Sequence, residues 1–373
     1  MPNHFSYADL NWISKNECVA VAEIHSLDHA EPAAAIVLLD LARPDHPPQI
    51  LRDSADFFGS LVVDASGRRV AWIEWNHPHM PWETNSLVVA QVMHNEHESI
   101  GLDDIRYVPN QKQASFCQLC FAGDGELFVV ADFAQSADTP RDFWNIYKLD
   151  GTDLALTSVT DARYEFGYPH WQFGDHRLLG STTTLLAIAS SPEGDHLWSL
   201  DLATNRQASY SSNATLQHLA WAEEQRTGVS GDRATAIMRS PSAPATIIEI
   251  SLASGAPPVV ERWPSDAGDS ASEAQVSPIE ISKPRHIRYP TRDGESAYAY
   301  FYAPLNSTQR CEQLPPVVVM VHGGPTARAY GHFDLQKQFW TSHGFAILDI
   351  NHRGSSGYGR HFRDALNGCW GDK

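Results

Sequence analysis

Short apolar runs separated by turn residues fill most of the chain, from about residue 5 to residue 283, and no convincing long amphipathic helix interrupts them. Five similar runs recur, at 36–42, 87–92, 146–151, 197–202 and 247–252. Equivalent positions in these runs are separated by steps of about 51, 59, 51 and 50 residues. A repeat of roughly 40 to 50 residues made of short strands is typical of β-propeller blades. We therefore predict a β-propeller domain over residues 1–283.

Tight turns precede several of the apolar runs and agree with this interpretation. They contain Gly, Asp and Ser, the residues that hairpin turns favour. They stand at 64–67, 123–125, 191–194 and 230–232. We expect these turns to be structural only.

The pattern changes after Pro284, where two unbroken apolar runs flank a helical segment. Val317 to Val321 predicts a strand that is buried on both faces, and Phe345 to Ile350 predicts a second. Between them we expect a helix from near His332 to His343, with Phe333, Gln336, Phe339 and Trp340 at helical spacing. Strand, helix and strand would form a right-handed βαβ unit.

A hairpin, from Arg285 to Tyr289 and from Ala297 to Tyr302, is expected before this unit. We place the domain boundary at Lys283-Pro284, so that 284–373 is the second domain. Its turn His322-Gly323-Gly324-Pro325 ends the first apolar run abruptly, and glycine lets the backbone turn tightly and approach a ligand.

Three segments of the second domain carry a resemblance: HGGPT at 322–326, FWTSHGFAILDINHRGSSGYGR at 339–360 and DALNGCWGD at 364–372. They resemble the opening of the catalytic domain of prolyl oligopeptidase-family serine peptidases, in the acylaminoacyl-peptidase and dipeptidyl-aminopeptidase branch. Segments 64–92 and 166–174 resemble propeller segments of the same branch. The resemblance implies an α/β-hydrolase domain behind a seven-bladed propeller, a Ser-Asp-His triad, and no metal or organic cofactor.

The resemblance also implies a catalytic turn that this sequence does not contain. In such enzymes the nucleophile lies in a G-x-S-x-G turn beyond the WG of the CWGD segment. The chain has no such turn: Gly354 to Tyr358 ends in tyrosine, and 228–231 and 268–272 also depart from the pattern. We therefore expect the nucleophile, Asp and His to lie beyond Lys373, and the chain as it stands to be an inactive, incomplete copy.

His322, Gly323 and Gly324 are the best candidates for a catalytic contribution. They follow the strand from which α/β-hydrolases supply one oxyanion-hole amide, and such an amide must point at the developing oxyanion. Arg353 and Tyr358 follow the next strand, where ligand sites gather, and are predicted to line a substrate pocket. A packed connection without a ligand is the alternative interpretation of that loop.

Other chemically suggestive residues receive structural interpretations. Ser355 and Ser356 lack an adjacent base in the sequence pattern and are not expected to be nucleophiles. Cys117 and Cys120 stand in a predicted strand without a second CxxC, so we expect buried thiols and no zinc site. The loop at 77–79, His-Pro-His, is expected to be structural and not a metal site.

Composition narrows the class of partner. Acidic residues outnumber basic ones by 45 to 27, which gives a formal charge of −18 and disfavours nucleic acid and anionic membranes as partners. The N-terminal residues do not form a secretory signal, no stretch approaches about 18 consecutive apolar residues, and five cysteines suit a reducing compartment. We expect a cytoplasmic protein that acts on short peptides, with its oligomeric state open.

Three functions remain open from the sequence. The first is a serine peptidase that hydrolyses short peptides. The second is an esterase or acyl hydrolase of the same architecture. The third is a non-catalytic propeller that binds peptides or protein partners, which the missing triad favours for this chain.

Overall fold

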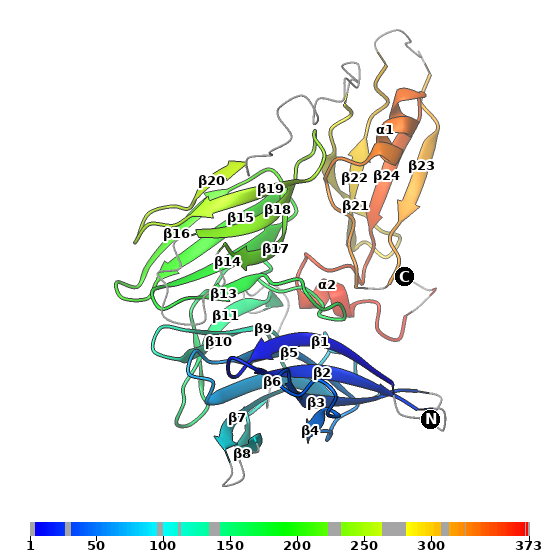
Figure 1. Cartoon of the computed structure of the whole chain (residues 1–373). Helices are drawn as coiled ribbons and strands as arrows, with labels where there is room; N and C mark the ends of the chain where they lie inside the picture. Colours follow the sequence, from blue (N-terminus) through cyan, green and yellow to red (C-terminus); the bar gives the residue numbers. More distant parts are fainter. Residues whose placement is uncertain are drawn as a thin grey trace. The chain divides into compact units, whose positions relative to one another are not determined.

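The computed structural model describes residues 4–26, 31–94, 100–110, 113–133, 142–222, 233–262, 281–306, 313–324, 326–369 and 371. Figure 1 shows that these residues are mostly strands. Within the described part, no helix is long and apolar enough to cross a membrane. Cys311, the turn predicted at 230–232 and the segment 263–280, which includes 268–272, lie outside the described residues.

Five four-stranded sheets follow one another along the chain. The first contains β1 (His4–Trp12), β2 (Glu17–His25), β3 (Ala33–Asp40) and β4 (Gln49–Arg52). The second contains β5 (Phe57–Val63), β6 (Arg69–Trp75), β7 (Ser86–His94) and β8 (Ile100–Tyr107). The third contains β9 (Ser115–Ala122), β10 (Glu126–Asp132), β11 (Asn145–Leu149) and β12 (Leu156–Ser158). The fourth contains β13 (Leu178–Gly180), β14 (Thr184–Ser191), β15 (Gly194–Asp201) and β16 (Arg206–Ser211). The fifth contains β17 (Thr215–Trp221), β18 (Arg233–Arg239), β19 (Thr246–Ser251) and β20 (Val259–Arg262).

In each of these sheets the strand order is the chain order. Neighbouring strands run antiparallel, for example β1 with β2 and β6 with β7. Such successive up-and-down sheets are the blades of a β-propeller, so the predicted fold class is confirmed for this part of the chain. The described residues hold five blades, not the seven that the resemblance implied. At about 50 residues each, five blades account for the chain up to residue 262.

The strands of the second sheet are apolar at nearly every position and do not alternate between apolar and polar residues. Their packing explains why. Val70 and Trp72 of β6 belong to a buried cluster shared with the first sheet, whereas Ala71 and Ile73 belong to one shared with the third. Successive side chains of a strand point to opposite faces. A blade that lies between two neighbours therefore buries both faces, and nearly every position must be apolar.

Backbone contacts divide the described residues into two compact units, which are treated separately below. The first unit holds 4–186 and 200–205. The second holds 187–199, 206–222 and 233–371, so it includes most of the fourth and all of the fifth blade as well as the last sheet. The domain boundary predicted at Lys283-Pro284 stays a prediction.

The last sheet belongs to the second unit and is mixed. Its order is β21 (Arg285–Pro290), β22 (Ser296–Tyr302), β24 (Ala346–Asn351) and β23 (Val317–Val321). β21 pairs with β22 and β22 with β24 in antiparallel register, whereas β23 and β24 are parallel. The helices are α1 (Leu335–Ser342) and α2 (Arg360–Asp364). The predicted hairpin and strand–helix–strand order are confirmed, and they form the first part of an α/β-hydrolase domain.

Helix α1 begins later than predicted because Asp334 caps it. The carboxylate of Asp334 accepts hydrogen bonds from the backbone N–H groups of Gln336 and Lys337, at 2.8 and 3.1 Å. At the other end Gly344 has a φ of 87°, the left-handed conformation that ends helices.

One prediction of burial is wrong in this sheet, the one for β23. β23 is an edge strand among the described residues, with Val317, Val319 and Val321 exposed by 51%, 53% and 62%. Only one face of β23 is covered, so half-buried and exposed side chains alternate along the strand. The apolar side chains on the other face are therefore exposed. On α1, Phe339 is 55% exposed, whereas the polar Lys337 is buried.

Candidate active-site turn

The turn at 322–324 leaves the carboxyl end of β23, beside the parallel β24. Gly324 has a φ of 58°, which glycine adopts without strain. Gly323 is exposed, and no atom outside its immediate neighbours lies within 4 Å of the point where a Cβ would stand. The structure therefore brings the three predicted oxyanion-hole residues to an open site at the end of a parallel strand. Their catalytic role stays a prediction.

The loop after β24 holds His322 at the start of this turn. The Oγ of Ser355 lies 2.7 Å from Nε2 of His322, and the ring of His352 stacks on the His322 ring at 4.6 Å between centroids. Burial lowers the pKa of His322, so its imidazole is neutral at pH 7. These contacts fix one end of the glycine turn.

The same loop also holds the other end of the turn. Ser356 donates its hydroxyl to the carbonyl oxygen of Thr326 at 2.6 Å and its backbone N–H to Ala327 at 3.2 Å. The amide side chain of Asn351 exchanges two hydrogen bonds with the backbone of Ala329, at 2.7 and 3.3 Å. HGGPT and NHRGSSGYG, two separate motifs in the sequence, therefore form one structural unit.

Ser355 corrects one statement made from the sequence, which found no base beside it. The structure places an imidazole at hydrogen-bond distance from its hydroxyl. However, Ser355 has no exposed surface. A hydroxyl without access to solvent cannot attack an external substrate, so the contact positions His322 and does not make Ser355 a nucleophile.

Arg353 and Tyr358 contact different parts of the sheet. Arg353 pairs with Asp293 and with Glu295, the latter at 3.0 Å, and its side chain is 8% exposed. It therefore ties the loop to the β21–β22 turn.

The Tyr358 hydroxyl accepts a hydrogen bond from Asn351 at 3.0 Å, and its ring stacks on Tyr298 at 4.1 Å. Burial raises the pKa of Tyr358, which keeps the phenol protonated. These packed contacts fit the connecting role that was the alternative, and the pocket-lining role of Arg353 and Tyr358 stays a prediction.

The remaining candidates from the sequence lie in the first unit. Cys117 and Cys120 are buried, as predicted, and burial raises the pKa of Cys120. In the loop at 77–79, the backbone N–H of His77 bonds to Asp56 at 2.9 Å and its ring meets Phe57 edge-on at 5.0 Å. Those contacts are structural.

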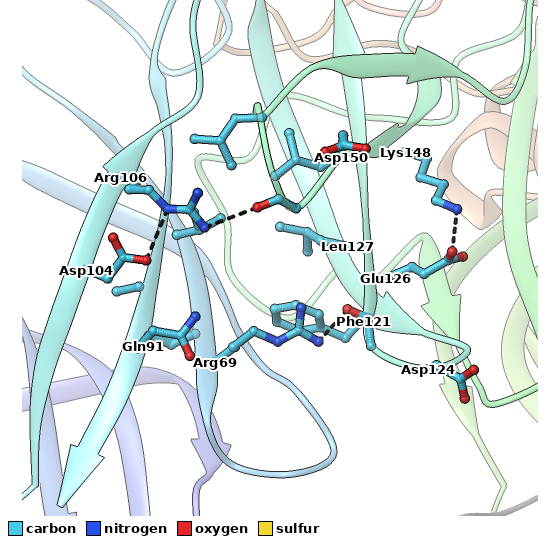
Figure 2. A pocket seen from close by; sticks show the side chains of 17 residues that line it. Arg69, Gln91, Asp104, Arg106, Phe121, Asp124, Glu126, Leu127, Lys148 and Asp150 are labelled. Carbon is cyan, nitrogen blue, oxygen red and sulfur yellow. Dashed lines mark hydrogen bonds and ion pairs between the residues drawn. The ribbon is translucent and has the colours of Figure 1, made fainter.

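A cavity of about 380 Å³ lies in the first unit, between the second and third blades (Figure 2). Three cations line it, and each has a partner. Arg69 pairs with Asp64, Arg106 with Asp104 at 3.3 Å, and Lys148 with Glu126. Because these charges are already compensated within the protein, they give no reason to expect a charged ligand there.

A second cavity, of about 320 Å³, lies in the second unit and was missed in the sequence. Arg328, Tyr300, Tyr330 and His286 line it. The only sequence signal was the position of Arg328, four residues after Gly324. Periodicity does not reveal that an arginine in such a loop turns inward.

Fold and site together define a class of protein: a β-propeller joined to the opening of an α/β-hydrolase domain, with a glycine turn after the first parallel strand. Comparison with known proteins shows what this chain is similar to. Residues 331–373 match the model of the prolyl oligopeptidase family. Dipeptidyl aminopeptidase BIII of Pseudoxanthomonas mexicana is 32% identical over 129 residues, which cover 32% of this chain and 19% of that protein.

Solved structures extend the likeness to the whole chain. The crystal structure of a puromycin hydrolase superposes with a TM-score of 0.80 at 25% identity, over 99% of this chain and 54% of that one. A puromycin-hydrolyzing peptidase of Mycobacterium tuberculosis gives 0.77 at 26% identity, over 97% and 52%. These comparisons support a likeness to peptidases of the prolyl oligopeptidase family, and the chain spans about half the length of these two solved structures.

Proposed function

We propose that this chain is part of a serine peptidase that hydrolyses short peptides, and that it supplies one side of the oxyanion hole. The observation that carries the proposal is the open glycine turn at the end of β23, held at both ends by the loop after β24. Such a turn can present backbone N–H donors to a tetrahedral intermediate without reorganising. The names of the relatives, which include a dipeptidyl aminopeptidase and puromycin hydrolases, support a peptide or aminoacyl substrate.

In this proposal the nucleophile, its Asp and its His come from residues beyond Lys373. An oxyanion turn without a nucleophile and a base can bind a carbonyl group but cannot form an acyl-enzyme. The 373-residue chain alone should therefore neither cleave an aminoacyl-anilide nor react with a fluorophosphonate probe. Labelling of this chain would contradict the proposal and would point to a serine within it. A cytoplasmic location remains part of the proposal.

The decisive experiment reads the coding sequence past Lys373. We expect an in-frame G-x-S-x-G segment, and the longer protein should cleave aminoacyl-anilides. In that protein Gly323→Val should lower kcat/KM by about 10²-fold or more, because a side chain would block the approach of the carbonyl oxygen. Gly151→Val is the matched control, since this glycine also has no atom within 4 Å of its Cβ position and lies in the first unit.

Each other result has a meaning. Full activity of the Gly323→Val protein would show that the turn is not the oxyanion hole. A stop codon after Lys373 would favour the non-catalytic propeller that binds peptides. Cleavage of esters but not of anilides would favour the esterase of the same architecture.

A further inference from the structure

The cavity of the second unit is built around a buried pair of opposite charges. Arg328 follows the glycine turn at 322–324. Asp195 is the second residue of β15, just after the β14–β15 turn. Their side chains are 8% and 2% exposed, and Nη2 of Arg328 lies 3.9 Å from Oδ1 of Asp195. That separation is too long for a hydrogen bond, so the two charges attract one another but leave donors and acceptors unused.

The guanidinium of Arg328 has spare donors. Its Nε is enclosed and has no hydrogen-bond partner among the described residues. Gly357 leaves the space for this group: a Cβ at that position would stand 2.7 Å from Nη1 of Arg328. A buried N–H without a partner is costly, and arginine is the residue that best binds a carboxylate with two parallel hydrogen bonds.

Asp195 has a spare acceptor. Its Oδ2 accepts the backbone N–H of Leu216 at 2.7 Å, whereas Oδ1 faces the guanidinium at the long distance. A carboxylate oxygen in this setting can accept a hydrogen bond from an ammonium group. The exposed Glu193 on the same cavity adds negative charge near that oxygen.

Aromatic rings form the walls between the charges. The guanidinium lies over the Tyr330 ring, 4.5 Å from its centroid, and the Tyr300 hydroxyl donates to the carbonyl oxygen of Pro192 at 2.8 Å. Burial lowers the pKa of His286, although Glu193 opposes the shift, so this ring is uncharged at pH 7. Arg328 is therefore the one cation among the described residues that line the cavity.

From this arrangement we propose that the cavity binds a small zwitterion, a free aromatic α-amino acid, with its carboxylate on Arg328 and its ammonium on Asp195. Such a ligand adds no net charge to a buried pair whose charges cancel. The aromatic walls suit a ring, and about 320 Å³ is at the small end of ligand pockets. The binding does not depend on the proposed peptidase activity, because none of these residues belongs to the oxyanion turn.

The first test uses the unaltered 373-residue chain and three probes in titration calorimetry. L-Phenylalanine should bind saturably. L-Phenylalaninamide, which lacks the carboxylate, and 3-phenylpropanoate, which lacks the ammonium, should each bind about tenfold more weakly or worse. Equal affinity for all three, or no saturable binding of L-phenylalanine up to about 10 mM, would overturn the proposal.

Variants assign each end of the ligand. Arg328→Gln should remove the preference for L-phenylalanine over its amide, and Asp195→Asn the preference over 3-phenylpropanoate. Arg328→Lys keeps the charge if the glutamine variant does not fold, and it should still weaken binding about fivefold or more because the planar fork is lost. Arg288→Gln and Asp153→Asn are the controls, since both side chains are exposed and lie outside the cavity. An unchanged preference in folded Arg328→Gln protein, or an unchanged affinity of folded Arg328→Lys protein for L-phenylalanine, would refute the assignment.

Discussion

Glu74 shows what a single buried carboxylate does inside a blade. It accepts hydrogen bonds from Nε1 of Trp72 at 2.8 Å and from the hydroxyl of Tyr107 at 2.7 Å, and it pairs with Arg52 at 3.6 Å. Glu74→Ala should lower the free energy of unfolding by about 3 to 5 kcal/mol, because it strands a buried cation and two donors. Urea unfolding measures this loss.

The control for that change is Glu126→Ala. Glu126 also has a cationic partner, Lys148, but its side chain is 40% exposed. Exposed pairs contribute at most about 1 kcal/mol. If the two variants lost the same stability, burial would not be the cause of the Glu74 effect.

His170 makes the first unit sensitive to acid. Burial lowers its pKa from the usual 6.5 to about 3, its Nδ1 has no partner within the described residues, and its ring meets Trp75 edge-on. Below about pH 6.5, His170 therefore binds a proton in the unfolded chain but not in the folded chain. The free energy of unfolding falls as the pH falls. Between pH 7.5 and pH 5 this residue alone should remove about 2 kcal/mol of stability.

The measurement compares unfolding free energies at pH 7.5 and pH 5 for the unaltered chain and for His170→Gln. The variant should lose about 2 kcal/mol less over this range. His46→Gln, a change at an exposed histidine, should keep the full loss. An identical pH dependence of all three proteins would show that His170 is not the group that titrates.

At the scale of elements, α1 docks on β24 through a buried ion pair. Nζ of Lys337 lies 2.6 Å from Oδ2 of Asp349 and 5.1 Å from the centre of the Tyr302 ring. Asp349→Ala should cost about 3 to 5 kcal/mol, since Lys337 would be buried without its partner. The double variant Lys337→Met with Asp349→Leu should recover most of that loss, as an apolar pair of similar volume often does.

Thermal unfolding of the second unit measures these changes in stability. The pair Arg233–Glu249, with side chains 50% and 21% exposed, provides a matched comparison in a strand pair. Glu249→Ala should cost no more than about 1 kcal/mol. A double variant at 337 and 349 that stays as unstable as Asp349→Ala would mean that α1 requires the charges themselves.

The sequence predicted elements well where a local rule decides them. The turn residues, the hairpin before Tyr302 and the order strand, helix, strand all follow from short patterns. It did not reveal that Lys337 is buried on α1, because its partner Asp349 lies on a strand whose place in the sheet no local pattern gives. It failed on Ser355 for the same reason, since His322 lies 33 residues away in the chain.

At the scale of the whole molecule, the repeat of about 50 residues was sufficient to predict a propeller, because each blade must bury both faces. The number of blades was not in the repeat and came from the resemblance, and the described residues hold five. The glycine turn at 322–324 was predicted from its motif, and its role in an oxyanion hole stays a prediction. The cavity around Arg328 was not predicted, because it assembles residues from β15, β21, β22 and other segments that no spacing relates.

The exposed face of β23 should make the chain self-associate. Val317, Val319 and Val321 are exposed on a strand that pairs only with β24 among the described residues, and such an edge is a template for another strand. Val319→Lys should reduce association without lowering stability by more than about 0.5 kcal/mol, because that side chain is already exposed.

Val318→Lys is the control. Val318 packs against the cluster around Tyr302 and Ile347, and a charge there should destabilise the second unit. Sedimentation velocity over a range of concentrations measures association, and an unchanged profile for folded Val319→Lys would show that β23 is not the associating edge.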